Sequence, residues 1–431
     1  MDVSHMADAP NWLKLDNTAN VYPAVRRRNW ASQFRLSATL TEEVNPVILQ
    51  WAVYRATSRF PAFSMQLKRG LFWHFLRRIE GGPPVRPDGC CPCEPLRPED
   101  NGDFYFRVSY YEKRISVDFF HALTDGTGAL SYFKTMLAEY LTSAYGIKVP
   151  RDGVILDCDE QSEPEEYEDS FQKYAGGLTR VLTPHAAFRI RGEREPDGFI
   201  NATMGIIPVD EVLERAKACG ASLTQYLATI MMLSIQSIQR REIPNNKRRA
   251  PVNLLIPINL RAFFPSYTTR NFTGIVTPSI DTRLGEYSFE EVLNVVKSHM
   301  STEITRRNLR ARFTAFVKSQ RNPILRAVPL ILKTPALRLA HRLTGERMSC
   351  TTMTNVGRCD VPPEMEGYID RMELIMGPLR ENPVVCSLMS YRGTLYISMA
   401  RSIKEPKLER EFFRRLVRLG ISVKIESNRR R

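Results

Sequence analysis

The chain has 431 residues, of which 43% are hydrophobic, so it can bury a large core and is long enough for two domains. No segment approaches the roughly 18 uninterrupted apolar residues that span a bilayer, and the N-terminus lacks the pattern of a secretory signal, so we expect a cytoplasmic protein. The net charge of +14 favours anionic partners: nucleic acid, phosphorylated cofactors, acidic carrier proteins or anionic membrane surfaces.

One strongly basic region spans residues 297–347 and mixes basic with apolar side chains at helical spacing. This pattern is typical of a surface helix with one buried face, and it also occurs in helices that lie on a membrane surface. We expect the buried face and keep peripheral membrane contact as the alternative. No helix-turn-helix or zinc-finger signature supports binding to nucleic acid.

Three cysteines, Cys90, Cys91 and Cys93, lie close together in the loop sequence GCCPCEP. A zinc site would need a second pair of ligands at matched spacing, and none follows nearby. The other cysteines are scattered, which argues against a disulfide framework. We therefore expect reduced thiols and no bound metal.

The first part of the chain combines strand and helix patterns. Asn45 followed by Pro46 is typical of a helix start, and the apolar spacing after them indicates a helix over 45–60. The alternating segments predict strands over 29–40, 63–68 and 72–79, then a loop over 81–98, a hairpin over 103–120 and a helix over 127–141.

Residues 157–169 are strongly acidic and nearly devoid of apolar side chains, which indicates a solvated linker. We therefore predict an N-terminal subdomain over 1–156, an acidic linker over 157–175 and a C-terminal subdomain over 176–431. In the C-terminal part, Pro208 and Ser222 precede two helices. Further strands are predicted over 252–261, 271–281, 348–355, 367–377, 384–393 and 394–402. Each half mixes strands with helices, so the fold class is α/β.

The candidate functional motif is HALTDG, in which His121 follows the apolar strand pattern and Asp125 and Gly126 precede a helix. A histidine at a strand end near the core has a tunable pKa and can act as a general base. Asp125 is too far along an extended chain to touch His121, but it could hold the turn by binding an arginine or backbone amides. The spacing alone is weak evidence, because a structural histidine where a strand stops would fit it as well.

The segment FFHALTDGTGAL resembles the H-x-x-x-D-G motif of coenzyme A-dependent acyltransferases, a group that includes chloramphenicol acetyltransferase, peptide-synthetase condensation domains and alcohol O-acetyltransferases. The segments LDNTANVYP, VNLLIPINLRAFFPSYTTRNFTG and TMTNVGRCDVP are similar to blocks of the alcohol acetyltransferase type and occur in the expected order. The resemblance covers residues 10–425. It implies two chloramphenicol-acetyltransferase-like subdomains, each a mixed sheet with flanking helices, that form a pseudo-dimer around a central tunnel.

The resemblance also implies roles for individual residues. His121 would be the acid-base catalyst and Asp125 a structural group paired with an arginine, either Arg261 or its rival Arg270. Backbone amides around Gly126 and a side chain of Thr354 or Asn355 are candidates for stabilising the oxyanion, although the Thr354–Asn355 segment also reads as a simple turn.

The implied reaction is direct acyl transfer from acyl-coenzyme A to a small alcohol, with no permanently bound cofactor and no metal. Condensation domains usually carry a second histidine just before the catalytic one, where this chain has Phe120. That departure favours a stand-alone acyltransferase, and the implied two-halved architecture can work as a monomer. Two alternatives stay open: a condensation-like enzyme that uses an acyl carrier protein or forms amides, and a catalytically silent binding or membrane-associated protein. Met232, Met353 and Met389 could line the tunnel or belong to the core.

Overall fold

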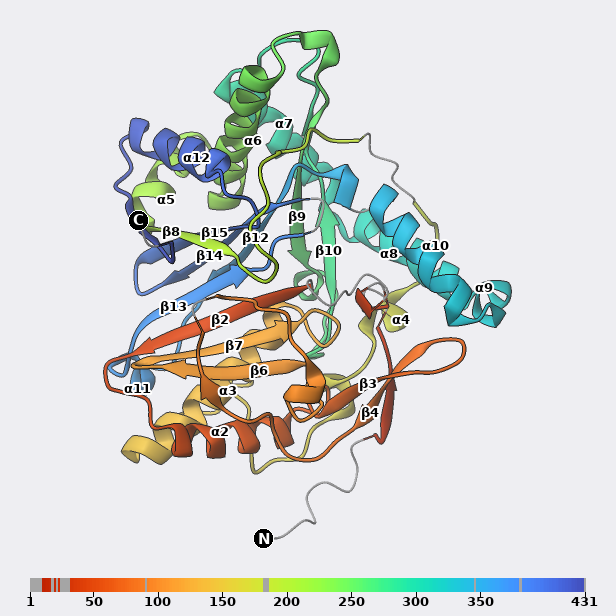
Figure 1. Ribbon diagram of the computed structural model, residues 1–431, viewed down its shortest axis with the longest axis vertical. Helices are drawn as coiled ribbons and strands as arrows, with labels where there is room; N and C mark the ends of the chain where they lie inside the picture. Colours follow the sequence, from red (N-terminus) through yellow and green to blue (C-terminus); the bar gives the residue numbers. More distant parts are fainter. Residues whose placement is uncertain are drawn as a thin grey trace.

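The computed structural model describes residues 10–429 except 17–18, 21, 24–31, 90, 181–185, 345 and 380–381. The described chain forms two halves, one above the other in Figure 1, and each half is a β-sheet with helices on its outer face. The predicted α/β class with two sheet-plus-helix halves is therefore confirmed.

The N-terminal half is built on a sheet of strand order β13-β2-β7-β6-β5, and α2 and α3 cover its outer face (Figure 1). The predicted helix start is confirmed, because the side chain of Asn45 accepts hydrogen bonds from the amides of Val47 and Ile48. The elements of this half are β2 (Gln33–Leu40), α2 (Pro46–Arg59), β5 (Arg86–Pro87), η2 (Pro98–Asp100), β6 (Phe106–Tyr111), β7 (Arg114–Phe120) and α3 (Gly126–Tyr145).

Strand β7 is the element that positions the HALTDG motif. It lies between β2 and β6 and pairs antiparallel with both, as the predicted hairpin requires. Residues 115–120 are buried, so the strand is fixed on both edges and both faces. The chain then turns sharply and enters α3, which places the motif between a central strand and a buried helix.

A smaller sheet of order β1-β4-β3 lies beside this half, formed by β1 (Trp12–Lys14), β3 (Met65–Arg69) and β4 (His74–Arg78). The tip of the β3–β4 hairpin projects toward α9 (Pro323–Ala327) and α10 (Leu330–Thr344) (Figure 1). It lies far along the sequence from those helices, yet the Leu330 amide donates a hydrogen bond to the Leu71 carbonyl.

The C-terminal half is an eight-stranded sheet of order β10-β9-β12-β14-β15-β8-β16, with β11 also paired to β9. Helices α5, α6, α7 and α12 cover its outer face (Figure 1). The strands are β8 (Asn201–Pro208), β9 (Val252–Asn259), β10 (Thr273–Val276), β11 (Ser279–Ile280), β12 (Thr351–Arg358), β14 (Val384–Tyr391), β15 (Thr394–Arg401) and β16 (Lys424–Ser427). The covering helices are α5 (Val209–Ala218), α6 (Leu223–Glu242), α7 (Phe289–Glu303) and α12 (Lys407–Arg418).

The shorter elements of the second half are η4 (Asn246–Arg248), η5 (Leu260–Ala262), η6 (Glu346–Met348) and α11 (Pro363–Glu366). Ser222 caps α6 in a reciprocal capping box with Gln225, which is the start that the sequence predicts. Within the described residues, no single helix is long and apolar enough to cross a membrane. Helices α5 and α6 meet that criterion only as a pair bent by 86°.

One strand crosses between the halves. Strand β13 (Ile369–Met376) comes from the C-terminal part of the sequence but pairs antiparallel with β2 at the edge of the N-terminal sheet. The next strand, β14, returns to the C-terminal sheet. The sequence pattern predicts the strand but not its partner, because strand propensity carries no information about which sheet edge is open.

The acidic segment contacts both halves. It contains η3 (Pro164–Glu166) and α4 (Ser170–Tyr174). The Glu166 carboxylate accepts two hydrogen bonds from the Arg59 guanidinium on α2, while the Glu166 carbonyl accepts one from the Thr269 amide, at 2.7 Å. Acidic side chains of this segment therefore pair with arginines of the N-terminal half, as Glu166 does with Arg59.

The two largest hydrophobic cores lie one in each half, although the N-terminal core also includes residues of the C-terminal sheet, Met389 among them. Met232 and Met353 lie in the C-terminal core, and Met389 lies in the N-terminal one. All three have no exposed surface, so they act as core residues.

The basic region over 297–347 folds into the end of α7 and then α8 (Arg306–Arg321), α9 (Pro323–Ala327) and α10 (Leu330–Thr344). Helix α8 has the predicted buried face, formed by Leu309, Phe313, Thr314 and Val317. Helix α9 has no buried residue. The expectation of one buried face is therefore correct for α8 and wrong for α9, whose five residues are too few to present a separate inner face to the core.

Candidate active site

His121 is the first residue after β7, and its backbone is held from both halves of the molecule. Its amide donates to the Ser32 carbonyl, just before β2, at 2.9 Å. Its carbonyl accepts from the side-chain amide of Asn271, just before β10, at 2.9 Å. The histidine is therefore fixed at the junction of the two halves.

The imidazole of His121 packs between two aromatic rings. The Phe34 ring centroid lies 4.6 Å away, and the Tyr22 ring is stacked at 5.4 Å with an interplanar angle of 19°. The side chain is half-buried, and Nδ1 is buried without a hydrogen bond to any described residue. Burial lowers the pKa of His121 to about 4, against a smaller opposing effect of the Asp125 charge. The imidazole is therefore neutral near pH 7 and can accept a proton.

Asp125 holds the turn in two directions. Its Oδ1 accepts from the amides of Thr127 and Gly128, each at 3.1 Å, and so caps the N-terminus of α3. Its Oδ2 accepts from Arg261 Nη1 at 2.8 Å, from the Phe272 amide at 2.7 Å and from the hydroxyl of Thr273 at 3.1 Å. One carboxylate thus ties the motif to the C-terminal half.

Arg261, rather than Arg270, is the arginine that pairs with Asp125. Arg261 lies in η5, and its remaining donors bond the carbonyls of Thr268 and Arg270. The Arg270 side chain turns away and donates to the carbonyls of Lys14 and Tyr167. Burial by itself raises the pKa of Asp125, but the Arg261 charge and the backbone donors outweigh it and lower the pKa. Asp125 is thus an ionised clamp.

The two glycines after Asp125 have different packing. A side chain on Gly126 would have its Cβ 3.1 Å from Val356 Cγ1 of β12, which shows how closely β12 approaches the motif. A Cβ on Gly128 would lie 1.9 Å from the Thr269 carbonyl oxygen. Gly128 is therefore required by the contact between the halves, which the sequence reasoning did not single out although the segment TDGTG contains it.

The two oxyanion candidates in β12 face opposite ways. The side chain of Asn355 donates to the Thr224 hydroxyl at the start of α6 and accepts from the Gly357 amide, so both ends of its amide are engaged. Successive strand residues alternate between faces, which directs Thr354 to the sheet face away from α6. The Thr354 hydroxyl makes no hydrogen bond within the described chain. Of the two, Thr354 is the available donor.

Two further residues near the site were missed from the sequence. Asn271, which bonds the His121 carbonyl, also donates to Asp16 Oδ2 at 3.1 Å. Burial raises the pKa of Asp16 to about 6, with Arg270 opposing this rise. Both residues lie inside the segments that carry the family resemblance, LDNTANVYP and TTRNFTG, which was the only available signal.

Phe120, which precedes His121, belongs to the core. It is only 2% exposed, and its ring packs against those of Tyr22 and Tyr105. It therefore supplies no polar group beside the imidazole.

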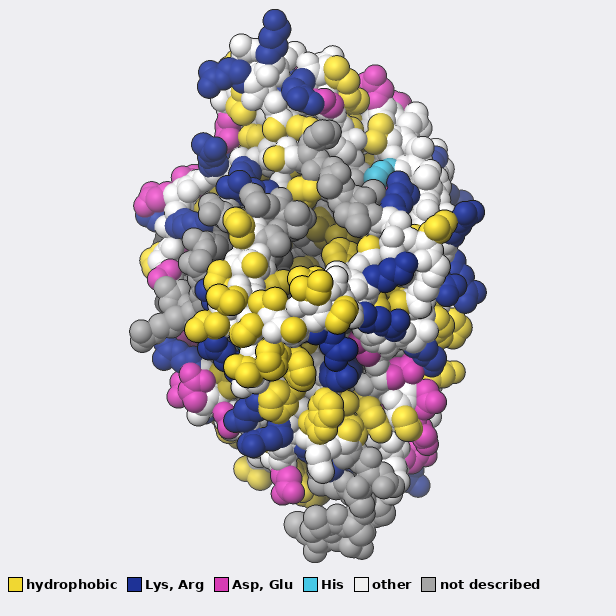
Figure 2. Space-filling model, turned by 90° about the vertical axis from the view of Figure 1, so that its right-hand side faces the viewer, with side chains coloured by type: hydrophobic (Ala, Val, Ile, Leu, Met, Phe, Trp, Pro, Cys, Tyr) yellow, Lys and Arg dark blue, Asp and Glu magenta, His cyan; other side chains and the backbone are white. Residues whose placement is uncertain are grey.

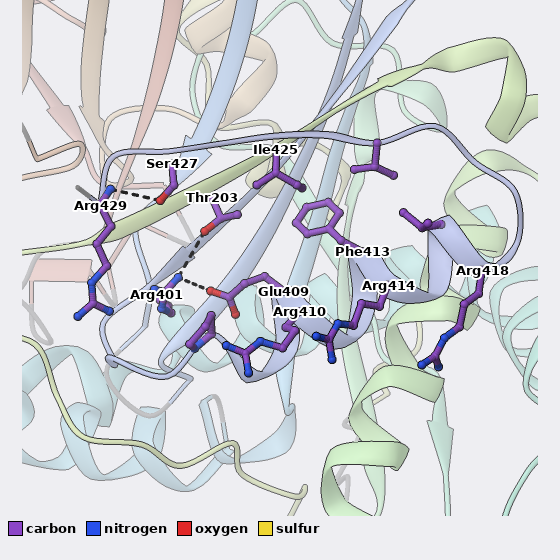
Figure 3. A pocket seen from close by; sticks show the side chains of 13 residues that line it. Thr203, Arg401, Glu409, Arg410, Phe413, Arg414, Arg418, Ile425, Ser427 and Arg429 are labelled. Atoms are coloured by element: carbon purple, nitrogen blue, oxygen red, sulfur yellow. Dashed lines mark hydrogen bonds and ion pairs between the residues drawn. The ribbon is translucent and has the colours of Figure 1, made fainter. Parts of the chain in front are cut away.

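A groove of about 630 Å³ lies elsewhere, between α12 and strands β8 and β16 (Figure 3). Its apolar wall includes Phe413 and Ile425, and Arg410, Arg414 and Arg418 project from successive turns of α12 along its edge. None of the residues around His121 lines this groove, so it is separate from the candidate active site.

Nothing among the described residues forms a group of three or more His, Cys, Asp or Glu side chains suited to a metal. Of the cysteine cluster, Cys93 is buried and Cys91 half-buried, both without a disulfide. Cys90 lies outside the described residues.

Proteins of known structure share this fold. No protein-family model matches the sequence, and no curated protein matches it. Among solved structures, TRI101 of Fusarium sporotrichioides, complexed with coenzyme A and T-2, has a TM-score of 0.65 at 11% identity, covering 96% of this chain and 99% of that one. The TRI3 trichothecene 15-O-acetyltransferase of the same organism has a TM-score of 0.59 at 8% identity, covering 96% of each chain.

The first condensation domain of the calcium-dependent antibiotic synthetase is also similar. Its TM-score is 0.60 at 14% identity, covering 97% of this chain and 100% of that one. The described helices and sheets thus match acetyltransferases and a condensation domain over nearly their whole length. The chain has the chloramphenicol-acetyltransferase-like fold that coenzyme A-dependent acyltransferases and condensation domains share.

Proposed function

We propose that this protein transfers an acyl group, acetyl being the first candidate, from acyl-coenzyme A to an alcohol hydroxyl, with His121 as the general base. The observation that carries the proposal is the state of the His121 imidazole. It is neutral, it lies where the two halves meet, and Nδ1 bonds no described residue. Asp125 has both oxygens engaged elsewhere, so the imidazole works without a carboxylate partner.

The chemistry follows from that geometry. A ring nitrogen of His121 takes the hydroxyl proton as the alcohol oxygen attacks the thioester carbonyl carbon. The tetrahedral intermediate then collapses, the carbon–sulfur bond breaks, and the imidazolium returns the proton to the leaving thiolate. The products are an ester and free coenzyme A, and the enzyme regains its neutral histidine.

The oxyanion of the intermediate needs a fixed donor. The amides of Thr127 and Gly128 already bond Asp125, which leaves the Gly126 amide at the start of α3. The Thr354 hydroxyl, on the strand whose Val356 packs against Gly126, is the proposed second donor.

The similar structures support this choice of substrates. The TRI101 structure holds coenzyme A together with T-2, and TRI3 is named as an O-acetyltransferase. The same fold is thus found with bound coenzyme A in one protein and with O-acetyl transfer in the other. The net charge of +14 suits the phosphates of coenzyme A.

The test is to incubate the purified chain with acetyl-coenzyme A and a panel of alcohols, measuring free thiol and identifying esters by mass spectrometry. His121→Ala should abolish turnover above background. His299→Ala is the matched control, because His299 is also half-buried with a lowered pKa but lies on α7. His299→Ala should retain turnover, whereas turnover that survives His121→Ala would reject the assignment.

The similar condensation domain makes a carrier-bound donor the second candidate. It predicts that acyl groups loaded on a carrier protein outcompete free acyl-coenzyme A, or that amines replace alcohols as acceptors. The same assay, run with both donors and both acceptor classes, separates the two reactions.

A further inference from the structure

Six large apolar side chains project into solvent where the tip of the β3–β4 hairpin meets α9 and α10. We call them the apolar tip patch: Leu71, Trp73, Ile324, Leu325, Ile331 and Leu332. Their exposed fractions run from 46% for Trp73 to 74% for Ile324. Figure 2 looks onto this side of the molecule and shows apolar side chains gathered across the middle of the face.

Hydrogen bonds to backbone carbonyls hold the segments of the patch together. The Leu330 amide donates to the Leu71 carbonyl at 2.8 Å. Lys333 Nζ donates to the carbonyls of Phe72 at 3.0 Å and Arg326 at 3.2 Å. One lysine thus bridges the hairpin and α9, so the hairpin tip and the consecutive helices α9 and α10, which lie far from it in the sequence, present their apolar side chains as one surface.

Helix α10 packs against the rest of the protein through Leu330 but leaves the next two apolar side chains in solvent. Leu330, the first residue of α10, is only 5% exposed, while Ile331 and Leu332 directly after it are exposed. Soluble monomers rarely expose contiguous apolar patches of this kind unless the patch binds something.

The segments that form the patch carry basic and no acidic residues, and the acidic side chains on this face lie further out (Figure 2). Residues 304–345 contain ten Lys or Arg and no Asp or Glu, and residues 65–79 contain no acidic residue either. Arg69, Arg321 and Arg326 are exposed beside the patch, and blue side chains flank the apolar ones in Figure 2. A second copy of the chain would bring an equally basic surface against this one, which like-charge repulsion disfavours. A surface with an apolar interior and anionic headgroups complements both properties.

We propose that this face docks on an anionic lipid bilayer, with the apolar tip patch inserted among the upper acyl chains and the arginines in the headgroup layer. Each basic residue near an anionic membrane contributes attraction that salt screens, while insertion of the apolar side chains contributes a part that salt does not screen. The proposal is independent of the proposed acyl transfer, because none of these residues contacts His121.

The experiment is co-sedimentation of the full chain with vesicles of phosphatidylcholine alone and with vesicles in which phosphatidylglycerol replaces part of it. We expect binding to the anionic vesicles, little binding to the neutral ones, and a reduced affinity at high salt. Substituting Ile324, Leu325, Ile331 and Leu332 together by Ser should weaken the binding at least about tenfold, since each removes apolar area that the bilayer would cover. All four are exposed, so the fold should be retained, as circular dichroism and thermal unfolding will show.

Two controls isolate the patch. Leu284→Ser removes a leucine that is 82% exposed elsewhere and should leave binding unchanged. Substituting Arg410, Arg414 and Arg418 together by Gln removes three exposed arginines on α12 and should weaken binding far less than the four serines do. The proposal is overturned if the wild-type chain ignores anionic vesicles, or if the four-serine variant binds them as well. It is also overturned if sedimentation shows a dimer that this variant loses, which would assign the patch to a second copy.

Discussion

Arg261 donates a hydrogen bond to Asp125 at 2.8 Å across 136 residues of sequence, and both side chains are almost fully buried. The pair joins η5 of the C-terminal half to the helix cap directly after the motif histidine. The position of His121 therefore depends on how the two halves dock.

Asp125→Asn should cost about 3 kcal/mol of unfolding free energy, because it leaves the buried Arg261 charge without its counter-ion. Denaturant unfolding at neutral pH measures this loss. Asp360→Asn is the control, since the Arg358–Asp360 pair is exposed and should cost at most about 1 kcal/mol. Equal losses in the two variants would contradict the clamp role.

The pH dependence of stability should reveal His121. Burial lowers its pKa to about 4 in the folded protein, against about 6.5 in the unfolded chain. The unfolded state therefore binds the extra proton between these values, and stability falls as the pH is lowered through this window. The contribution is about 2 kcal/mol between pH 7 and pH 5. His121→Gln should remove that part of the slope, and an unchanged slope would count against a buried neutral imidazole.

The ionisation of Asp16 should change stability with pH in the direction opposite to that of His121. Its pKa is raised to about 6 in the folded protein, so the stability that its neutral form contributes is present below about pH 4 and is lost as the pH rises through 6. Asp16→Asn should therefore gain stability relative to wild type between pH 5 and pH 7, by on the order of 2 kcal/mol. The measurement is the unfolding free energy of both proteins as a function of pH. If the two free energies change in parallel between pH 5 and pH 7, the raised pKa is refuted.

Gly128→Ala should destabilise the protein by more than about 2 kcal/mol, because its Cβ would overlap the Thr269 carbonyl oxygen. Gly367→Ala is the matched control, since a Cβ there meets nothing within 4 Å and φ is −68°. Thermal unfolding compares the two. Similar melting temperatures would show that the contact between the halves relaxes easily.

Thr354→Val should lower kcat by about a hundredfold if the hydroxyl stabilises the oxyanion, whereas Thr354→Ser should retain most of the activity. Steady-state kinetics with acetyl-coenzyme A and the best acceptor provide the measurement. A change confined to KM would assign Thr354 to substrate binding instead.

Much of the local structure was predictable from local signals. Asn45 with Pro46 and the capping box at Ser222 marked helix starts, and alternation marked the β6–β7 hairpin, because these patterns reflect interactions between residues close in sequence. The HALTDG motif could also be found in the sequence, because its residues lie close together along the chain. The exposed side chains of α9 were not predicted, since periodicity shows that a helix has an apolar face but not what that face contacts.

The sequence by itself determined the elements, the α/β class and the placement of His121 and Asp125 at a strand–turn–helix junction, because backbone propensities and capping act over a few residues. Only the tertiary structure decided that Arg261 rather than Arg270 reaches Asp125, that Asn271 bonds the histidine carbonyl, and that β13 joins the other sheet. Those choices depend on contacts between distant segments, whose energies arise only when the two halves pack together.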